Sequence, residues 1–544
     1  MSDAIYDAIV IGGGQHGLIT ACYLQKAGLQ TAIFERLGHL GGSMTSQEGP
    51  APGFTMNNCA SWTRFYSHPA YRDFNLRDKG LEYVFPEGCE VMIYDDETCF
   101  VGHSALKVVD NITGKTEVSH ENLQKTINSI RRFSNHDAGV VEEYFGRYLK
   151  KWKPAYGRYR LNPPTPWGTK NALEELLDDP EGIDPLYLFM TCQQIAYDVF
   201  ESDELRTLFM RAAMTSNGFA PYDVMGLYGF IHTMAMVLSW EPPAVAKGGT
   251  QSITNALVAA FTELGGEYFT RSEVSKLLIE QGQAKGIRLR NGSEITARQV
   301  VVSDLNAYQT VCKLIGEEHV DPKIIRRIKN IRYDRHNIFW ANFAVHELPE
   351  YKATAFDPEC GPQPRIYIGP KDPDYLANQY MAEIFTAGLS RQLYLFVGPD
   401  SIWDETRAPA GKHVLGVEEI SAPTRFFTHN RWQDIKTELE TRVIDQWQRY
   451  APNMTRDNLI GSIVYTPYDI EAKLPNMHQG SISVGDMILS QQDRFRPIPE
   501  MSNYRTPIKN LYLASAAAHC GIGIGRGSSY CCFQAISADL GLEG

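Results

Sequence analysis

Residues 6–17, YDAIVIGGGQHG, join a short apolar run to a glycine cluster, and helical apolar spacing follows from Leu18 to Ala27. The apolar run is typical of a buried strand. In a turn between a strand and a helix, Gly12 makes the tight bend and Gly14 lets the backbone approach a pyrophosphate, while Gly17 permits close packing. The free N–H groups at the start of the helix bind phosphates. The stretch therefore predicts a dinucleotide-binding site.

A second predicted strand, residues 31–34, ends in Glu35. A carboxylate at this point, 21 residues after Gly14, is placed to accept hydrogen bonds from a ribose. Residues 36–45, RLGHLGGSMT, then bring a glycine pair and small hydroxyl residues just past the ribose position. Such a glycine turn lets the chain pass close to the cofactor beyond its pyrophosphate, which favours FAD over NAD.

Two later stretches contribute further elements of the same kind. KGGT at 247–250 opens a predicted helix that reaches LGGE at 264–267, and NLYLA at 510–514 is a predicted strand. The glycine-rich loop AHCGIGIGRG follows at 518–527. Only 17 residues follow that loop, and a βαβ unit needs about 30, so the loop does not start a second nucleotide fold. Between these stretches, short strands are predicted at 274–279, 284–289 and 294–302.

With these motifs in this order, the chain resembles the phytoene desaturase or phytoene dehydrogenase-like family of the flavin amine oxidase superfamily. That family includes proteins of the "pyridine nucleotide-disulfide oxidoreductase domain-containing protein 2" type. The stretches PGF at 52–54, ASW at 60–62, FSNHDA at 133–138 and NPP at 162–164 also fall in the order seen in that family. Three residues depart from its pattern, namely Ser43 for the usual Arg, Cys520 for Pro, and Ile522 among the glycines.

The resemblance implies an α/β fold with a Rossmann-type FAD-binding domain interleaved with an α+β substrate-binding domain. Residues 1–64, 243–309 and 485–544 are expected to form the first domain, and residues 65–242 and 310–484 the second. The helix that starts within Gly525 to Ser528 is expected to face the flavin. Bound FAD is expected to be non-covalent and to contact Gly12, Gly14, Gly17, Glu35, Arg36, Gly41, Gly42, Ser43, Met44, Thr45, Val274, Ser515, Ile524 and Gly525.

Candidate catalytic residues are those closest in sequence to the expected flavin position, His519, Arg526 and Tyr530. Each has a structural alternative: His519 bonded to backbone, Arg526 in a salt bridge, and Tyr530 packed on its helix. Alternation suggests that Tyr228, Phe230 and His232 line the substrate cavity, although core packing is also consistent with them. Residues 147–160 combine basic and aromatic side chains without an acid, which suits either peripheral contact with a membrane or a solvated helix face.

Composition narrows the class of protein. The 544 residues contain 52 Lys and Arg against 64 Asp and Glu, giving a net charge of −12, which argues against nucleic acid as a partner. No apolar run of about 18 residues and no signal pattern is visible, so we expect a cytoplasmic protein. The ten cysteines include no CxxC and no zinc spacing, so neither a redox disulfide nor a metal site is expected.

The expected activity is FAD-dependent dehydrogenation of a carbon–carbon bond in a small hydrophobic or cyclic substrate; the electron acceptor is unknown, and oxygen and a quinone are both open alternatives. A flavin amine oxidase shares the N-terminal fingerprint and remains an alternative. A non-redox isomerase that uses reduced FAD is a second, and a non-catalytic flavoprotein scaffold is a third. Neither the substrate nor the acceptor follows from the sequence.

Overall fold

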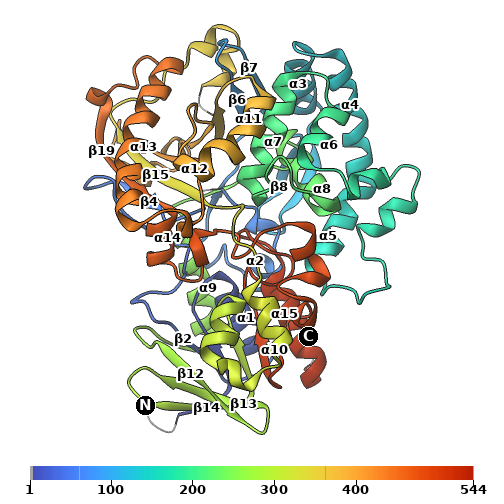
Figure 1. The fold of residues 1–544 in the computed structure, drawn as a ribbon, viewed down its shortest axis with the longest axis vertical. Coiled ribbons are helices and arrows are strands. Elements are labelled where there is room, and N and C mark those ends of the chain that lie inside the picture. The colour runs from blue at the N-terminus through green and yellow to red at the C-terminus, as the bar shows by residue number, and fades with distance from the viewer. Residues whose placement is uncertain (1–3, 61, 362, 543–544) are drawn as a thin grey trace.

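The computed structural model describes residues 4–60, 62–361 and 363–542, so Ser61 of the ASW stretch lies outside the described residues. Two large sheets organise the molecule, and Figure 1 places one towards each end of its long axis. Helices pack on both sheets. No helix in the described part of the chain has both the length and the apolar composition needed to cross a bilayer.

The first sheet is the Rossmann-type sheet that the sequence predicts. Its parallel strands run in the order β11-β2-β1-β14-β20, and the antiparallel hairpin of β12 and β13 pairs with the first half of β14. All seven strands fall in the segments predicted for the FAD-binding domain, whose boundaries stay a prediction. The strands are β1 (Ile5–Ile11), β2 (Thr31–Phe34), β11 (Glu267–Phe269), β12 (Val274–Glu280), β13 (Gln283–Leu289), β14 (Glu294–Ser303) and β20 (Leu511–Leu513).

Three helices from distant parts of the chain pack together beside this sheet (Figure 1), which explains why segments far apart in sequence build one site. Cys22 Sγ on α1 contacts the Leu257 carbonyl oxygen on α9 at 3.6 Å, and Thr20 Oγ1 donates to the Ser529 carbonyl oxygen on α15 at 3.3 Å. These helices are α1 (Gln15–Lys26), α9 (Gln251–Glu263) and α15 (Ser528–Leu540).

The second sheet is mixed, with the order β19-β15-β18-β17-β16-β6-β7. All of its neighbouring pairs are antiparallel except β16 with β6. The strands are β6 (Gly88–Ile93), β7 (Cys99–His103), β15 (Ile338–Val345), β16 (Arg365–Ile368), β17 (Leu395–Gly398), β18 (His413–Ile420) and β19 (Leu459–Tyr465). Its larger helices are α3 (His120–Arg131), α4 (Asn135–Arg147), α7 (Asp203–Asn217), α8 (Gly226–Val237) and α13 (His429–Tyr450).

Smaller elements complete the fold. Three short strand pairs are β3 (Ser46–Glu48) with β4 (Thr55–Asn57), β5 (Tyr83–Val84) with β10 (Val245–Ala246), and β8 (Leu106–Asp110) with β9 (Lys115–Val118). The short helices are α2 (Pro69–Asp73), α5 (Lys153–Leu161), α6 (Cys192–Val199), α10 (Pro322–Lys329), α11 (Pro373–Gln379), α12 (Phe385–Ala387) and α14 (Pro467–Lys473).

The basic and aromatic segment 147–160 is helical, and its aromatic side chains point inward. Tyr148, Trp152, Tyr156 and Tyr159 are all buried. Trp152 Nε1 donates to a backbone carbonyl oxygen, whereas the basic side chains at the surface pair with acids, Lys151 with Asp179 at 2.8 Å among them. The aromatic rings are therefore part of the core and are not available for insertion into a membrane.

Candidate active site

The turn between β1 and α1 leaves room only for glycine at its key positions. Gly12 has a φ of +93°, in the left-handed region that L side chains rarely adopt. A Cβ at Gly14 would lie 2.5 Å from Asp304 Oδ2, and a Cβ at Gly17 would lie 2.3 Å from the Gly12 carbonyl oxygen. α1 then begins at Gln15, which lines a cavity; its N-cap residue Gly14 has no side chain to cap the helix, and the Asp304 carboxyl group interacts with the N–H groups of Gly14 and Gly17. A helix start of this kind binds anions such as phosphate.

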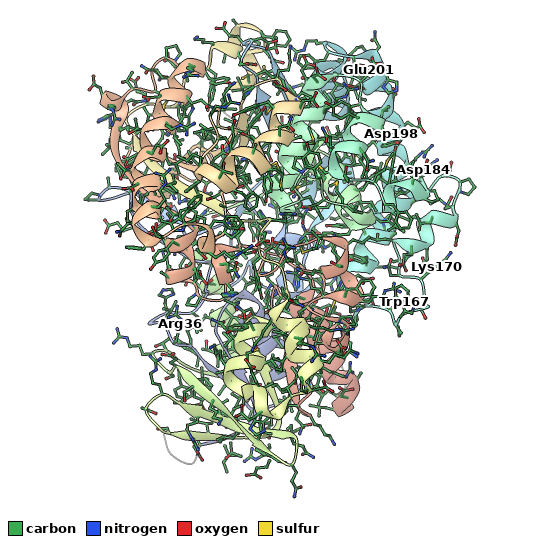
Figure 2. All side chains as sticks on the ribbon, viewed as in Figure 1. Arg36, Trp167, Lys170, Asp184, Asp198 and Glu201 are labelled. Carbon is green, nitrogen blue, oxygen red and sulfur yellow. The ribbon has the colours of Figure 1, made fainter. Side chains whose placement is uncertain are left out.

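Glu35 stands at the end of β2 with its carboxylate held by two backbone groups. The Gly13 N–H donates to Oε2 and the Leu37 N–H donates to Oε1, each at 2.8 Å. Glu35 is buried and borders the same cavity. Because each carboxylate oxygen has two lone pairs, both oxygens can still accept a bond from a ribose hydroxyl. Arg36 is exposed at the edge of the molecule (Figure 2) and donates to the Lys473 carbonyl oxygen at 3.0 Å.

The second glycine turn packs directly on the first. Gly41 and Gly42 have φ values of +113° and +58°. The Gly41 N–H donates to the Gly13 carbonyl oxygen at 2.7 Å, and a Cβ at Gly41 would lie 2.6 Å from Thr254 Oγ1 on α9. The predicted cofactor contacts of this stretch thus divide into two sets. Gly42 and Ser43 line the cavity, and Gly41, Met44 and Thr45 shape the turn behind it.

A cavity of about 1100 Å³ connects this nucleotide turn with the second sheet. At one end it is bordered by Glu35, Arg36 and Val274, in the middle by the start of α1 and the second glycine turn, and at the far end by α8 and the second sheet. The first two parts supply a carboxylate for a ribose, a helix start for a pyrophosphate, and a glycine cradle that a side chain would fill. The residues present therefore fit the FAD that the sequence predicts.

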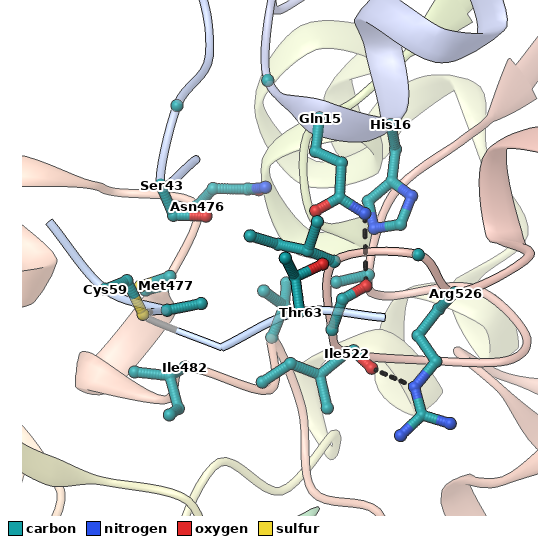
Figure 3. Close-up of a pocket in the computed structure, with 18 of the residues that line it drawn as sticks. Gln15, His16, Ser43, Cys59, Thr63, Asn476, Met477, Ile482, Ile522 and Arg526 are labelled. Atoms are coloured by element: carbon teal, nitrogen blue, oxygen red, sulfur yellow. Dashed lines mark hydrogen bonds between the residues drawn. The ribbon is translucent and has the colours of Figure 1, made fainter. Parts of the chain in front are cut away.

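The loop between β20 and α15 forms one wall of this cavity (Figure 3). Gln15 Nε2 on α1 donates to the Gly523 carbonyl oxygen at 3.2 Å, and Arg526 Nε donates to the Ile522 carbonyl oxygen at 3.0 Å. Gly523 and Gly525 have φ values of +117° and +91°, so the loop turns sharply enough to approach α1. Ile524 and Gly525 border the cavity, and α15 begins three residues after Gly525.

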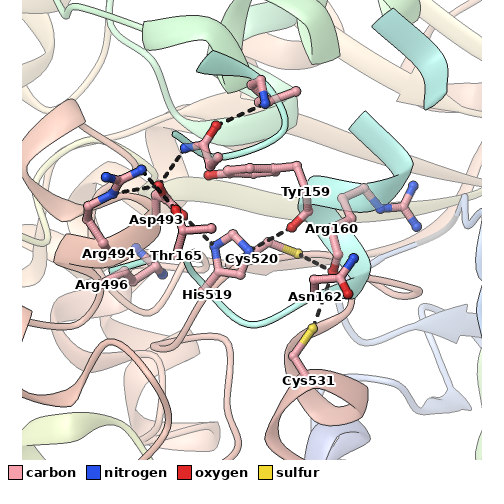
Figure 4. A network of polar contacts seen from close by, with 12 residues as sticks. Tyr159, Arg160, Asn162, Thr165, Asp493, Arg494, Arg496, His519, Cys520 and Cys531 are labelled. Atoms are coloured by element: carbon pink, nitrogen blue, oxygen red, sulfur yellow. Dashed lines mark hydrogen bonds and ion pairs between the residues drawn. The ribbon is translucent and has the colours of Figure 1, made fainter. Parts of the chain in front are cut away.

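His519 belongs to a polar network behind this loop and is not among the residues that line the cavity (Figure 4). Its Nε2 donates to the Tyr159 carbonyl oxygen at 2.8 Å, and its Nδ1 lies 3.7 Å from Asp493 Oδ1. Burial lowers the pKa of His519, so the ring is neutral at pH 7. Cys520 extends the network to α5, since its Sγ contacts the Arg160 carbonyl oxygen at 3.6 Å. These contacts favour the structural alternative for His519.

Arg526, Tyr156 and His232 meet where the loop faces α8, and all three line the cavity. His232 Nε2 accepts a hydrogen bond from Arg526 Nη2 at 3.0 Å, and its Nδ1 lies 3.1 Å from Tyr156 Oη, which also accepts from Arg526 Nη1. Burial, followed by the charge of Arg526, holds the pKa of His232 well below its usual range. A neutral His232 that accepts at Nε2 carries its hydrogen on Nδ1 and donates it to Tyr156. The hydroxyl hydrogen of Tyr156 is then left to point into the cavity.

One face of the second sheet forms the floor of the far end. The register aligns Tyr367, Phe396, Glu418 and Trp340 across four neighbouring strands, and the last three line the cavity. Burial raises the pKa of Glu418 to about 7, against the lowering effect of Arg211. Within the described part of the chain, Glu418 Oε1 has no hydrogen-bond partner. The floor therefore contains one carboxyl group among aromatic rings, with a buried oxygen that is unpaired within the described residues.

Sequence reasoning missed Glu418 and Asp304. The signal for Glu418 was a pair of acids inside the otherwise apolar stretch VLGVEEI, residues 414–420. Asp304 directly follows β14, at the edge where the β1 turn also lies, and it borders the cavity. Burial raises the pKa of Asp304 well above its usual range, against the lowering effect of hydrogen bonds from the Gly17 and Gly14 N–H groups.

The alternation of Tyr228, Phe230 and His232 was a wrong indication, because the segment is the helix α8 and not a strand. On a helix, Tyr228 and His232 share a face whereas Phe230 points elsewhere. Only His232 of the three borders the cavity. Tyr228 Oη donates to Asn217 Oδ1 at 3.0 Å, and the Phe230 ring packs in the core.

Three other predicted positions also lie behind the cavity wall. Tyr530 packs on Tyr23, with ring centroids 5.2 Å apart, and does not line the cavity. Ser515 is fully buried, and its carbonyl oxygen accepts from Ser528 Oγ at 2.7 Å, which fixes the start of α15. Gly17 supports the β1 turn by its small size alone. Of the three candidate catalytic residues, the structure thus brings Arg526 alone to the cavity.

Comparison with known proteins agrees with this geometry. The family model described as "Flavin containing amine oxidoreductase" matches residues 17–332. "Pyridine nucleotide-disulfide oxidoreductase domain-containing protein 2" from Rattus norvegicus is 26% identical, over 97% of this chain and 93% of its own length. A limonene dehydrogenase subunit from Castellaniella defragrans is 25% identical (99% and 95%), and "Phytoene desaturase (lycopene-forming)" from Pseudescherichia vulneris is 24% identical (95% and 95%).

Solved structures support the fold. An oxidoreductase from Methanosarcina mazei superposes with a TM-score of 0.59 at 15% identity, covering 98% of this chain and 99% of that protein. At this identity the likeness concerns the fold alone. The predicted resemblance to the phytoene desaturase-like proteins is thus confirmed by the sequence relatives, and the predicted α/β fold by the structural neighbour.

Proposed function

The chain belongs to the flavin containing amine oxidoreductase family and is an FAD-dependent oxidoreductase, and from that premise we propose that it dehydrogenates a carbon–carbon bond of a hydrophobic substrate. Relatives named as a limonene dehydrogenase and a phytoene desaturase support this choice. The observation that carries it is the apolar far half of the cavity. Its walls include Ala235, Met236, Ile338, Trp340, Phe396, Met477, Ile482 and Val484.

Dehydrogenation removes one hydrogen with its electron pair and the other as a proton. When bound, FAD supplies the hydride acceptor at its N5 atom. The apolar walls exclude water from the reacting carbons. The Glu418 carboxyl group is our candidate for the proton acceptor, because Glu418 lines this half of the cavity and its Oε1 has no hydrogen-bond partner among the described residues. Its pKa of about 7 makes it ionised in part at neutral pH yet basic enough to take a proton.

Arg526 and Tyr156 are proposed to orient the substrate beside the C-terminal loop. Arg526 is fixed through the Ile522 carbonyl oxygen and through His232, so its guanidinium does not need to reorganise when a substrate enters. The Tyr156 hydroxyl is held by the same group and donates its hydrogen to an acceptor atom of the substrate. A preorganised donor of this kind lowers the cost of charge that develops in the transition state.

An amine oxidase remains the main competing function, since the family carries that name. The charges of the cavity disfavour it. Arg64, Arg365 and Arg526 line the cavity, and the pKa of the neighbouring His232 is lowered by all three. A protonated amine would be repelled by these guanidinium groups. An isomerase that uses reduced FAD has the same walls available, and it is separated from a dehydrogenase by its independence of an electron acceptor.

Anaerobic reduction of the bound flavin tests the proposal. The FAD-loaded protein is mixed with saturated and unsaturated cyclic hydrocarbons, cyclic ketones, carboxylic acids and amines, and the loss of flavin absorbance is followed. We expect bleaching by a compound whose product has gained a carbon–carbon double bond. Bleaching by amines alone would assign the amine oxidase function. Conversion of a substrate to its isomer by the pre-reduced protein, without any acceptor and without net oxidation of the flavin, would assign the isomerase.

A further inference from the structure

Two guanidinium groups converge on one sulfur atom at the far end of the cavity. Arg64 Nη1 donates to Met236 Sδ at 2.8 Å, and Arg365 Nη1 donates to the same sulfur at 3.5 Å. All three residues line the cavity. A thioether sulfur is a weak acceptor. Two charged donors therefore share a partner that satisfies neither of them.

Only one of these two charges has an ion-pair partner within the described residues. In the described part of the chain Arg64 forms no ion pair, and its Nη2 donates to the Glu241 carbonyl oxygen at 3.0 Å. Arg365 pairs with Glu90 at 3.2 Å, and burial raises the pKa of Glu90 against the lowering effect of Arg365 and Arg64. The Nε–H groups of Arg64 and Arg365 are both buried and lack an acceptor among the described residues. The site is built for an additional anion.

Burial makes this excess of donors significant. Arg365 is 5% exposed, and each unsatisfied donor in such a place costs free energy that an incoming acceptor recovers. The arginines reach the site from separate elements, Arg365 from β16 and Arg64 from the loop before the short helix at Phe65–Ser67, while Met236 belongs to α8. The convergence is therefore produced by the tertiary fold and is not a local sequence cluster.

We propose that Arg64 and Arg365 bind a carboxylate of the substrate, so that the substrate is a hydrophobic carboxylic acid. This inference rests on the proposed function and names its substrate class. A carboxylate presents planar lone pairs that match guanidinium donors. A monoanion suits the site better than a phosphate dianion, because Glu90 and Glu418 already bring negative charge to this end. The apolar walls then receive the hydrocarbon body of the acid.

Calorimetric binding to the FAD-loaded protein tests this inference without turnover. Each acid is compared with its neutral counterpart: cyclohexanecarboxylate with cyclohexylmethanol, and octanoate with octan-1-ol. We expect each acid to bind at least about tenfold more tightly than its alcohol, as charge-assisted hydrogen bonds provide. Equal affinity for acid and alcohol would overturn the inference, and tighter binding of octyl phosphate than of octanoate would overturn the choice of a carboxylate.

Variants locate the site. Arg64→Met and Arg365→Met should each weaken acid binding by about tenfold or more and leave alcohol binding unchanged. Arg72→Met is the matched control, because Arg72 is exposed and pairs only with Asp73 within the described residues, and it should bind acids like the parent protein. Arg365→Met leaves the buried Glu90 without its ion-pair partner and could fail to fold for that reason. Arg64→Met then carries the test alone, since it breaks no ion pair of the described residues. Unchanged acid binding in Arg64→Met would overturn the inference.

The outcome is separable from that of the proposed function. Tight binding of acids without flavin reduction by any carbon–hydrogen donor would keep the anion site and reject the dehydrogenase. Rapid flavin reduction by neutral hydrocarbons, with acids bound no more tightly than alcohols, would keep the dehydrogenase and reject the anion site.

Discussion

The two ends of the cavity are formed by different chemical groups, backbone atoms at one end and side chains at the other. At the nucleotide end the chain offers backbone, with glycines at Gly12, Gly14 and Gly42 and the start of α1. At the substrate end it offers side chains, such as Glu418 from the sheet and Met236 from α8. Backbone sites depend on local turns, whereas side-chain sites depend on sheet register and helix orientation. Variants at the nucleotide end should therefore change cofactor affinity, and variants at the substrate end should change rate.

The largest expected effect is at Gly17. In Gly17→Ala the new Cβ would lie 2.3 Å from the Gly12 carbonyl oxygen, a backbone atom that can move only with the turn itself. We expect the purified variant to retain no FAD, measured by flavin absorbance after desalting. Gly146→Ala in α4 is the control, because no described atom lies within 4 Å of its Cβ, and it should keep full flavin. Full flavin in Gly17→Ala would break the claim that backbone packing decides the nucleotide end.

Glu418 gives the largest expected effect on rate. Glu418→Gln keeps the size of the side chain but removes the proton acceptor, so flavin reduction should slow by about 100- to 10,000-fold. A base works in its deprotonated form, and burial raises the pKa of Glu418 to about 7. The rate in the parent protein should thus rise from about pH 6 and level off above about pH 8. Stopped-flow reduction across pH measures both, and a full-speed, unchanged profile in Glu418→Gln would remove Glu418 from the mechanism.

Arg526 and His519 sharpen the comparison, because they lie on the same loop with different surroundings. Arg526→Met should keep its FAD and slow flavin reduction by about 100-fold, as expected when a preorganised donor is lost. His519→Ala should instead lower the melting temperature and the flavin content together, since it removes a buried hydrogen bond to Tyr159. Its rate per bound flavin should stay close to that of the parent protein. Slow reduction in a stable, fully loaded His519→Ala would restore His519 as a catalytic candidate.

The smallest expected effect concerns Glu35. Glu35→Gln keeps one amide oxygen for a backbone donor but loses the charge that strengthens bonds from a ribose. FAD affinity should fall by roughly tenfold, with the rate of flavin reduction at saturating FAD unchanged. Fluorescence titration of the apoprotein with FAD measures the affinity. A change in rate without a change in affinity would contradict the assignment of Glu35 to the nucleotide end.

The nucleotide end was largely predictable from sequence. Gly12 and Gly14 lie in the turn that follows β1, and Glu35 directly follows β2. Local sequence rules therefore place all three residues. The same rules placed β2 at Thr31–Phe34, and the family resemblance placed the start of α15 within Gly525 to Ser528, where the helix begins at Ser528. The predicted contacts that do not reach the cavity, such as Met44 and Thr45, belong to a correctly predicted turn. What sequence could not show is which side of that turn each residue faces.

The substrate end was mostly beyond sequence reasoning. Glu418 lies beside Phe396 and Trp340 only because β17, β18 and β15 pair in one register. Phe396 is 22 residues and Trp340 is 78 residues from Glu418 in the sequence. His232 was suggested for the wrong reason, since the period of α8 was taken for that of a strand. Arg64 and Arg365 are separated by 301 residues and carry no shared motif. Such convergence is set by tertiary packing, which a single sequence does not encode locally.

Because the strands of the first sheet come from distant parts of the chain, the ribosome makes the parts of the cofactor site at different times. β1 leaves the ribosome well before its neighbour β14, which ends at Ser303, and before the loop that completes the cavity, which reaches Arg526. At roughly 5–20 residues per second, synthesis from the β1 turn to Arg526 takes about half a minute to two minutes. FAD therefore has no complete site to enter while the chain is being made. We therefore expect FAD to bind only after the loop up to Arg526 has been made.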